Sequence, residues 1–542
     1  MEPNNPSYKI LQPLILAATI SIGMMIGYKL NDKPEMNLIS KQVFPEDSLN
    51  YTGRIEELLR FIDNKYVDTI NSELLTDTAI QAILAKLDPH SSYMSPDETK
   101  SQNDEMNGNY YGIGVENHFI NDTVIISNVF EGGPAAQAGL KVFDKIIMVD
   151  GDTVAGRKLD YENIRKRFRK QLGQQVELKI LRFGKSYDFT IQVGGIKVKS
   201  VSSTYLSDIE TALIKIDRFG TNTYKEFMEE VEKEFGKNKA KHLILDLRSN
   251  PGGYLPEAIN ILCQIFKEKD KLLLYTEGRS GKRNEYKSTG KYFFNIDKVI
   301  VLIDENSASA SEIIAGAIQD WDRGIIIGRR SYGKGLVQEQ YPLNNGGAIR
   351  LTVSRYYTPS GRSIQKDYSD SDYYNKDIIR RYEHGDLFYK DSSTVKNATV
   401  FHTKIYKREV SSNGGITPDI FIGLKDSGTD FLAFEEYSLL PEFAFKYISM
   451  NPALFGNKSI QLKDDAQYRN AFEIFMTSRL GAAYVKKKNI NPSYYFDEFK
   501  MNINKILSKI DKEGNPYIKG DQFMIAAIAA IRENKSLKDI NQ

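Results

Sequence analysis

Three short apolar runs, separated by longer amphipathic stretches, constrain the fold of this chain more than any other feature. The runs cover residues 242–247 (HLILDL), 298–303 (KVIVLI) and 324–327 (GIII). Continuous apolar runs of this length are typical of strands buried on both faces of a parallel sheet. A further strand is expected at 212–216, and helices are expected at 224–235, 256–266 and 311–318. The alternation predicts a βαβ-type core over 196–426, with helices packed on a sheet.

The composition of the 542 residues, 41% hydrophobic and 27% charged, is that of a globular protein with several domains. The net charge of +2, from 73 basic and 71 acidic residues, argues against a nucleic-acid partner. A basic cluster at 165–170 is typical of a solvated helix face. Cys263 is the one cysteine and lies in an apolar pattern, so no intramolecular disulfide is expected.

An uncharged N-terminal stretch indicates a membrane segment. The 19 residues between Lys9 and Lys29 carry no charge, which is about the length of one membrane-spanning helix. A cleaved signal peptide is the alternative, but no A-x-A-like cleavage site follows the stretch. We therefore expect a signal-anchor in 1–31. The flanking lysines do not settle its orientation.

The remaining segments differ clearly in character. Residues 32–105 begin as a polar tether and become helical, with helices expected around 55–66 and 74–87. Short strands, small helices at 135–138 and 160–172, and glycine turns predict a compact domain at 106–195. Residues 367–410 are rich in tyrosine and charge and show little apolar periodicity, which favours an insertion loop or a lid. Residues 427–542 are expected to form a helical extension.

The segment 304–312 (DENSASASE) places three serines between an expected buried strand and an expected helix. They are Ser307, Ser309 and Ser311. The free N–H groups at the start of a helix could stabilise an oxyanion beside a serine nucleophile. Ser309 and Glu312 also fit a capping box, which is a purely structural feature. The local sequence favours the cap over the nucleophile.

A serine nucleophile requires a base, and the sequence offers a lysine in place of histidine. None of the five histidines lies in a familiar catalytic setting, and no G-x-S-x-G elbow is present; they are His90, His118, His242, His384 and His402. Lys334 lies between Gly333 and Gly335, where the backbone can approach a cleft closely. Burial there would lower its pKa and favour the neutral amine.

The same lysine also suggests a nucleotide-binding loop. Gly328, Gly333 and Lys334 fit the G-x-x-x-x-G-K pattern, in which the next residue should be Ser or Thr. That position is Gly335, and the stretch LVQEQYP that follows is expected to be extended rather than helical. An ATP-dependent function is therefore the least favoured hypothesis.

The segment DLRSNPGG at 246–253 directly follows one of the apolar runs. Gly252 and Gly253 could turn backbone N–H groups into a cleft, as an oxyanion hole requires. A plain strand-to-helix turn explains the segment equally well.

Taken together, these segments resemble the carboxy-terminal processing peptidases, also called tail-specific proteases. Eight segments occur in the order of that family between about 50 and 425: LDPHSSYMSP, YGIGV, GPAAQAGL, DLRSNPGG, NSASASE, YGKGLVQ, LTVSRYYTPSGRSIQ and GGITPD. The resemblance implies a multidomain α/β fold with a ClpP/crotonase-like serine protease core and an inserted PDZ domain at 106–195. An N-terminal helical segment and the C-terminal extension would complete the chain.

The resemblance also implies roles for individual residues. Ser309 would be the nucleophile, Lys334 its general base, and Gln338 would orient the lysine amine. The oxyanion donors would be the N–H of Ala310 and that of either Gly252 or Gly253.

In the PDZ domain, Gly112, Ile113 and Gly114 would capture the terminal carboxylate of a peptide, and the helix at 160–172 would wall the groove. No metal or other cofactor is implied.

The function expected from this resemblance is that of a membrane-tethered serine endopeptidase. It would lie in the cell envelope, anchored in the inner membrane with its bulk on the periplasmic or extracytoplasmic side, and would cleave proteins with apolar C-terminal tails. The PDZ domain could instead serve as a scaffold or a gate. The alternative function is a non-catalytic PDZ adaptor, against which the intact Ser309, Lys334 and Gln338 argue. The C-terminal helices could form a homodimer.

Overall fold

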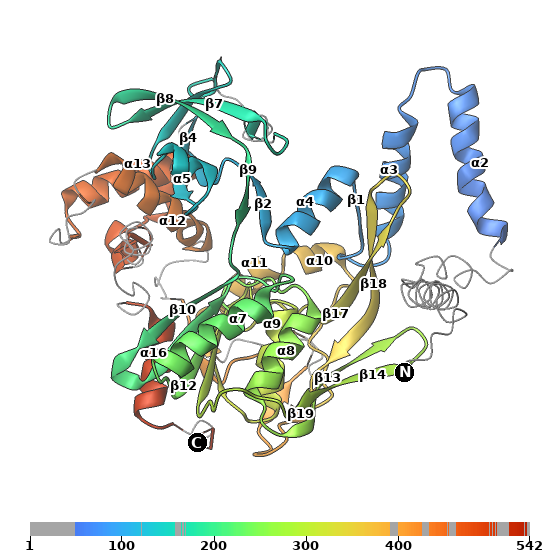
Figure 1. Ribbon diagram of the computed structural model, residues 1–542, viewed down its shortest axis with the longest axis vertical. Coiled ribbons are helices and arrows are strands. Elements are labelled where there is room, and N and C mark those ends of the chain that lie inside the picture. The colour runs from blue at the N-terminus through green and yellow to red at the C-terminus, as the bar shows by residue number, and fades with distance from the viewer. Residues whose placement is uncertain are drawn as a thin grey trace, which may run out of the picture. The chain divides into compact units, whose positions relative to one another are not determined.

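The computed structural model describes most of the chain between 49 and 538 (Figure 1). The residues left out of this range are 121, 158–163, 165, 166, 169, 391–398, 413, 425–432, 452, 453, 455–461, 498, 501, 504, 505, 507–519 and 536. The expected signal-anchor and most of the expected helix at 160–172 therefore lie outside the described residues. Within the described part of the chain, no helix is both long and apolar enough to cross a membrane.

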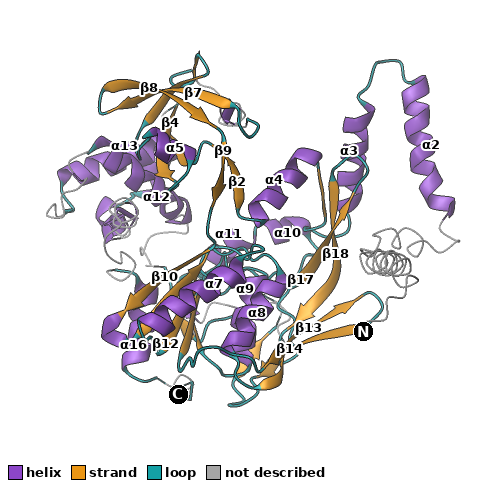
Figure 2. Cartoon of the chain, viewed as in Figure 1, coloured by secondary structure: helices purple, strands orange, loops and turns teal. Residues whose placement is uncertain are grey.

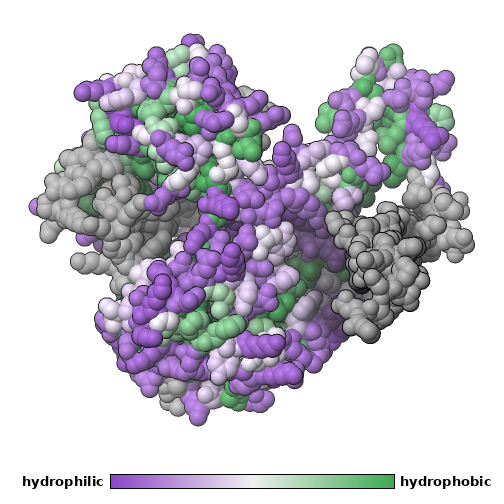
Figure 3. All heavy atoms as spheres, viewed as in Figure 1, coloured by the Kyte–Doolittle hydropathy of each residue, from purple (hydrophilic) through white to green (hydrophobic). Residues whose placement is uncertain are grey.

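The chain divides into two compact units, Met1–Ala82 and Ile83–Gln542. In the first, α2 (Leu49–Lys65) is amphipathic, as its spacing predicts. Its apolar side chains are uncovered: Leu58 and Phe61 are each 57% exposed. Figure 3 shows apolar atoms on the surface around α2 and α3 (Ser72–Leu84), at its upper right. An uncovered apolar stripe of this kind is typical of a contact surface.

A six-stranded sheet forms the core of the second unit (Figure 2). Its strands, in spatial order, are β10 (Val201–Leu206), β11 (Thr211–Ile216), β12 (His242–Asp246), β15 (Val299–Ile303), β16 (Ile325–Gly328) and β21 (Ile420–Phe421). All pairs from β11 to β21 are parallel, and only β10 runs antiparallel to its neighbour. The strands expected from the apolar runs are thus confirmed.

The two faces of this sheet are covered by segments from different parts of the chain. Val301 and Ile303 of β15 belong to the cluster formed with α7 (Thr223–Val231), α8 (Leu255–Ile265) and α9 (Ala310–Asp320). Ile300 and Leu302, which point to the opposite face, pack in a cluster with α16 (Gln522–Arg532). The C-terminal extension therefore buries a face that the βαβ helices leave open.

A second, antiparallel sheet supports the loops beside the core. It contains β1 (Ser92–Met94), β18 (Ala348–Tyr357), β13 (Lys269–Gly278) and β14 (Arg283–Thr289), with β17 (Leu336–Pro342) also paired to β18. The segment LDPHSSYMSP, whose two prolines favour a loop, contains one short strand, β1. Ser92, Tyr93 and Met94 pair with β18, a partner about 250 residues away that local sequence could not reveal.

The small domain is an antiparallel sheet in the order β3-β4-β5-β7-β8. These strands are β3 (Val115–Ile120), β4 (Thr123–Val129), β5 (Lys145–Val149), β7 (Gln175–Arg182) and β8 (Lys185–Gln192), with α5 (Pro134–Ala138) packed beside β8. Val124 and Ile126 of β4 face the core of this domain. Ile125 faces the other way, into a cluster with α12 (Ala433–Met450) and α13 (Ala466–Leu480).

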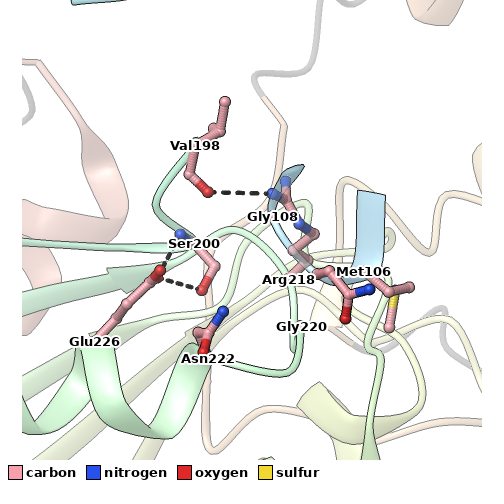
Figure 4. Close-up of a pocket in the computed structure, with 9 residues that line it drawn as sticks. Met106, Gly108, Val198, Ser200, Arg218, Gly220, Asn222 and Glu226 are labelled. Carbon is pink, nitrogen blue, oxygen red and sulfur yellow. Dashed lines mark hydrogen bonds between the residues drawn. The ribbon is translucent and has the colours of Figure 1, made fainter. Parts of the chain in front are cut away.

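Two linkers connect the small domain to the core. The first follows Met106, the last residue of α4 (Pro96–Met106), whose carbonyl accepts from the Thr221 N–H at 2.9 Å. The second contains Ser200, whose N–H and hydroxyl both donate to Glu226 Oε2, at 2.6 and 2.7 Å. Figure 4 shows both linkers lining one small pocket together with Arg218 and Asn222. Hydrogen bonds therefore join both linkers to the same part of the core.

The described residues of the insertion at 367–410 form regular structure, where an insertion loop or a lid was expected. The insertion contains α10 (Ser371–Asn375), α11 (Asp377–Glu383) and strands β19 (Val400–His402) and β20 (Glu409–Ser411). Tyr374 and Arg381 are only 3% exposed, and Arg381 donates to the carbonyls of Arg330 and Ser331. Apolar periodicity gave little sign of this packing because buried tyrosine and arginine make up much of the interior, together with a few aliphatic residues such as Leu387.

Candidate active site

Ser309 lies at the junction of β15 and α9 in a strained conformation. Its φ of 54° and ψ of −113° lie outside the regions that non-glycine residues favour. Such a conformation costs about 1–3 kcal/mol and is found mostly at functional sites. The Ser309 N–H donates to Glu312 Oε2 at 2.8 Å, so Glu312 has the position expected in a capping box.

The structure distinguishes between the three serines of this segment. Ser307 and Ser311 are fully buried. The Ser307 hydroxyl donates to the Leu247 carbonyl at 2.8 Å, and the Ser311 hydroxyl donates to the Asn250 carbonyl at 3.0 Å. Ser309 is the partly exposed serine of the three. It is therefore the one whose hydroxyl a substrate could reach.

The glycines of DLRSNPGG lie directly against Ser309. A Cβ on Gly252 would be 2.7 Å from the Ser309 Cβ and 3.0 Å from the Ala310 nitrogen, so no side chain fits there. The Gly252 N–H already donates to Asn250 Oδ1 at 2.8 Å. The Gly252 carbonyl accepts from the Phe219 N–H, and in a trans peptide the following N–H points the opposite way. The Gly253 N–H therefore points away from Phe219.

Two side chains hold the Ser309 and Lys334 backbones together. The Glu312 carboxylate accepts from the N–H groups of Ser309, Gly333 and Lys334 at 2.7–2.9 Å, and from the Ser331 hydroxyl at 2.5 Å. The Tyr356 hydroxyl donates to the carbonyls of Ser309 (3.2 Å) and Lys334 (2.9 Å). Burial raises the pKa of the Glu312 carboxyl, and the bonds that it accepts oppose this rise.

Sequence reasoning assigned Glu312 only a capping role and did not single out Tyr356 at all. Two signals were available. Glu312 lies in the first turn of α9, and Tyr356 lies in LTVSRYYTPSGRSIQ, one of the segments that match the family. The distance along the chain, 47 residues from Ser309 to Tyr356, hid the contact.

The Lys334 amine is held by Gln338, which in turn is held by the LDPHSSYMSP segment. The amine donates to Gln338 Oε1 at 3.1 Å, and Gln338 Nε2 donates to the His90 carbonyl at 2.6 Å. Burial lowers the pKa of Lys334, and the positive charge of Arg350 lowers it further. Within the described residues, no hydrogen bond joins this amine to the Ser309 hydroxyl, so a proton transfer requires the amine to turn toward Ser309.

The loop that carries Lys334 does not have the context of a nucleotide-binding loop. Strand β17 begins at Leu336, where a phosphate-binding loop would continue into a helix. Gly333 has a φ of 89°, and a Cβ there would lie 3.1 Å from the Gly415 nitrogen. The glycine pattern is thus explained by close packing of GGITPD against this loop.

In the small domain, Gly112, Ile113 and Gly114 form the connection between β2 (Asn109–Gly112) and β3. Ile113 is buried, and its carbonyl accepts from the Ala135 N–H at 2.7 Å. Gly114 has a φ of 86°, which favours glycine. Strand β3 lies at the edge of its sheet, and the helix expected to wall the groove lies mostly outside the described residues.

Comparisons with known proteins agree with this architecture. A model described as "Peptidase family S41" matches residues 210–374, and one described as "PDZ domain" matches residues 111–193. A carboxy-terminal-processing protease of Bartonella bacilliformis is 35% identical over 328 residues, covering 59% of this chain and 74% of the relative. The carboxy-terminal processing protease CtpB of Bacillus subtilis is 35% identical over 318 residues, covering 58% of this chain and 65% of that protein.

Among solved structures, a photosystem II D1 C-terminal processing protease is 26% identical, with a TM-score of 0.34. The match covers 57% of this chain and 89% of that one. From the family models and the Bartonella relative, we conclude that the chain belongs to the carboxy-terminal-processing proteases, serine peptidases of family S41 that here carry a PDZ domain.

Proposed function

We propose that this peptidase cleaves peptide bonds with Ser309 as nucleophile and Lys334 as general base. The observation that supports this most strongly is that Glu312 and Tyr356 each bind the backbone of both residues, which fixes the two segments against one another. A serine hydroxyl and a desolvated lysine amine are the two groups that such a mechanism requires.

The reaction would proceed through an acyl-enzyme. Neutral Lys334 takes the proton of the Ser309 hydroxyl as its Oγ bonds to the scissile carbonyl carbon, and the carbonyl electron pair moves onto oxygen. When this intermediate collapses, the C–N bond breaks and the leaving amine takes the proton from the Lys334 ammonium. A water molecule then attacks the ester, gives a proton to Lys334, and releases the product acid while Ser309 regains its proton. Gln338 would direct the amine throughout.

Two backbone N–H groups are suited to hold the oxyanion. The Ala310 N–H is at the start of α9, where the first N–H groups have no partner within the helix. For the second donor we favour Gly253 over Gly252, because the Gly252 N–H is occupied by Asn250. Donors fixed in this way stabilise developing negative charge without reorganisation.

The PDZ domain would capture the C-terminal tail of a substrate. A peptide can add as a strand to the edge of β3, with its carboxylate at Gly112, Ile113 and Gly114. We further propose that the tail is apolar and that substrates are envelope proteins reached from an inner-membrane anchor. The uncharged stretch between Lys9 and Lys29 supports this location.

A homodimer through the C-terminal helices is less well supported than one through α2. Most of the described apolar residues of α12, α13 and α16 are packed within this chain, and each helix exposes one large apolar side chain (Met450, Ile474 and Ile525), whereas α2 exposes three, Ile55, Leu58 and Phe61. We therefore propose α2 as the contact with a second copy.

The catalytic proposal is tested with an unfolded protein substrate that ends in an apolar tail. We expect the parent to cleave it and folded Ser309→Ala and Lys334→Ala variants to leave it intact. Cleavage by Ser309→Ala at the parent rate would exclude this nucleophile. A parent that binds the tail but cleaves nothing would favour the non-catalytic PDZ adaptor. The same substrate with an amidated C-terminus tests tail capture, because loss of the carboxylate should raise KM.

A further inference from the structure

The insertion after residue 366 places one tyrosine, Tyr374, beside the residues that hold Lys334 in position. Tyr374, in α10, is 3% exposed although its neighbour Tyr373 is 37% exposed. A hydrogen bond of 2.6 Å joins the Tyr374 hydroxyl to His90 Nε2. The two rings meet edge to face, with 5.6 Å between centroids and 83° between planes.

His90 connects this contact to the Lys334 amine. Burial, together with the charge of Lys334, lowers the pKa of His90 to about 4, so the ring is neutral at neutral pH. While its ring is bound to Tyr374, its backbone carbonyl accepts from Gln338 Nε2 at 2.6 Å. Gln338 Oε1 in turn accepts from the Lys334 amine at 3.1 Å. Three hydrogen bonds, through His90 and then Gln338, therefore connect Tyr374 to the Lys334 amine.

The other side of Tyr374 contacts the loop that precedes Lys334. The amine of Lys366 lies 4.3 Å from the centroid of the Tyr374 ring and 3.8 Å from that of Tyr332. Tyr332 directly precedes the Gly333–Lys334 turn, and the Tyr332 and Tyr374 rings meet at 77°. Tyr374 is therefore packed between the two segments that determine where the Lys334 amine lies.

We propose that Tyr374 is a positioning residue for the general base, so that the tyrosine-rich insertion is part of the catalytic apparatus rather than a lid. This inference rests on the proposed role of Lys334. The Tyr374 hydroxyl fixes His90, the His90 carbonyl fixes Gln338, and Gln338 directs the amine. Because Tyr374 is only 3% exposed, its side chain is closed off from a bound substrate, and its effect should fall on the rate of the chemical step rather than on substrate binding.

The test compares two matched variants from the same short helix. Tyr374→Phe removes the hydroxyl that binds His90 but keeps the ring over Lys366, and Tyr373→Phe makes the same change at an exposed position. We expect Tyr374→Phe to lower kcat roughly three- to tenfold, as for one lost hydrogen bond, with KM unchanged. Tyr373→Phe should match the parent in both constants.

A double-mutant cycle with His90→Ala distinguishes positioning through His90 from a general structural role. Once the imidazole is removed, Tyr374→Phe should cause no further loss of kcat. Additive losses would overturn the proposal, and so would a rise in KM with kcat unchanged, or a lower melting temperature with full kcat. Full activity of Lys334→Ala would instead overturn the catalytic proposal on which this one rests.

Discussion

Lys334 and Lys366 occupy adjoining loops, and the comparison between them shows what makes a lysine a base. The Lys366 N–H donates to the Gly333 carbonyl at 3.0 Å, so the two backbones are in contact. Burial lowers the pKa of both side chains, that of Lys366 to about 8. Lys366 is the more buried of the two, at 8% exposure, and burial alone would select it as the base.

The partners of the two amines reverse that choice. The Lys366 amine lies 3.2 Å from Asp377 Oδ2 and between two tyrosine rings, which favour its charged form and enclose it. The Lys334 amine has the neutral amide of Gln338 as its partner, and its backbone is tied to that of Ser309. A lowered pKa is therefore not sufficient, because a base also needs a lone pair that can turn toward the nucleophile.

The largest expected effect comes from removing each amine in turn. Lys334→Met should lower kcat roughly 10²–10⁴-fold, the usual contribution of a general base. Lys366→Met should retain kcat to within about tenfold, because its amine contributes packing and not proton transfer. Steady-state cleavage of one unfolded substrate by both variants measures the difference. If Lys366→Met were less active than Lys334→Met, the assignment of Lys334 as the base would be wrong.

The second prediction concerns a variant in which Lys334 gains a carboxylate partner, as Lys366 has in Asp377. Gln338→Glu places a carboxylate beside the amine, which should raise the lysine pKa by about one unit or more. At neutral pH the neutral fraction of Lys334 falls, so kcat should fall about tenfold or more and should recover in part as the pH is raised. The loss that remains at high pH is the cost of removing the Nε2 donor to the His90 carbonyl. Measurement of kcat at pH 7 and pH 9.5 checks this. A variant that loses equal activity at both values would contradict it.

The smallest expected effect on catalysis is that of Asp377→Asn. The change leaves the buried charges of Lys366 and Arg381 without their carboxylate, and should cost roughly 3 kcal/mol of unfolding free energy. Because Lys334 keeps its own partners, kcat of the folded variant should stay near that of the parent. Urea unfolding and initial rates at low temperature separate the two quantities, and Asp372→Asn, at an exposed pair with Lys376, is the control.

Several parts of this account could be predicted from sequence. The apolar runs located β12, β15 and β16, because strands buried on both faces carry that signal locally. Extended structure was expected for the stretch LVQEQYP after Gly335, and β17 confirms it. The choice among Ser307, Ser309 and Ser311 followed from family resemblance, since local sequence favoured a helix cap.

Other parts depend on contacts between distant residues. Nothing near Tyr356 or Tyr374 indicates that they touch Ser309, Lys334 or His90, because these pairs are brought together only by folding. One further signal is present in the sequence. The run Val124, Ile125, Ile126 breaks the alternation expected of a strand with one solvated face. It predicts that both faces of this strand are buried, and α12 and α13 cover the face that carries Ile125.

The pH dependence of kcat in the parent and in Lys366→Met tests the central claim most directly. If neutral Lys334 is the base, kcat rises with pH through the lowered pKa of that lysine, and below it the protonated amine cannot accept from Ser309. The groups whose charges act on this pKa are Arg350, Glu312 and Asp88, so removing the Lys366 charge should leave the rise at the same pH. If kcat of the Lys366→Met variant no longer rose with pH, or rose at a different pH from that of the parent, the assignment of Lys334 would be contradicted.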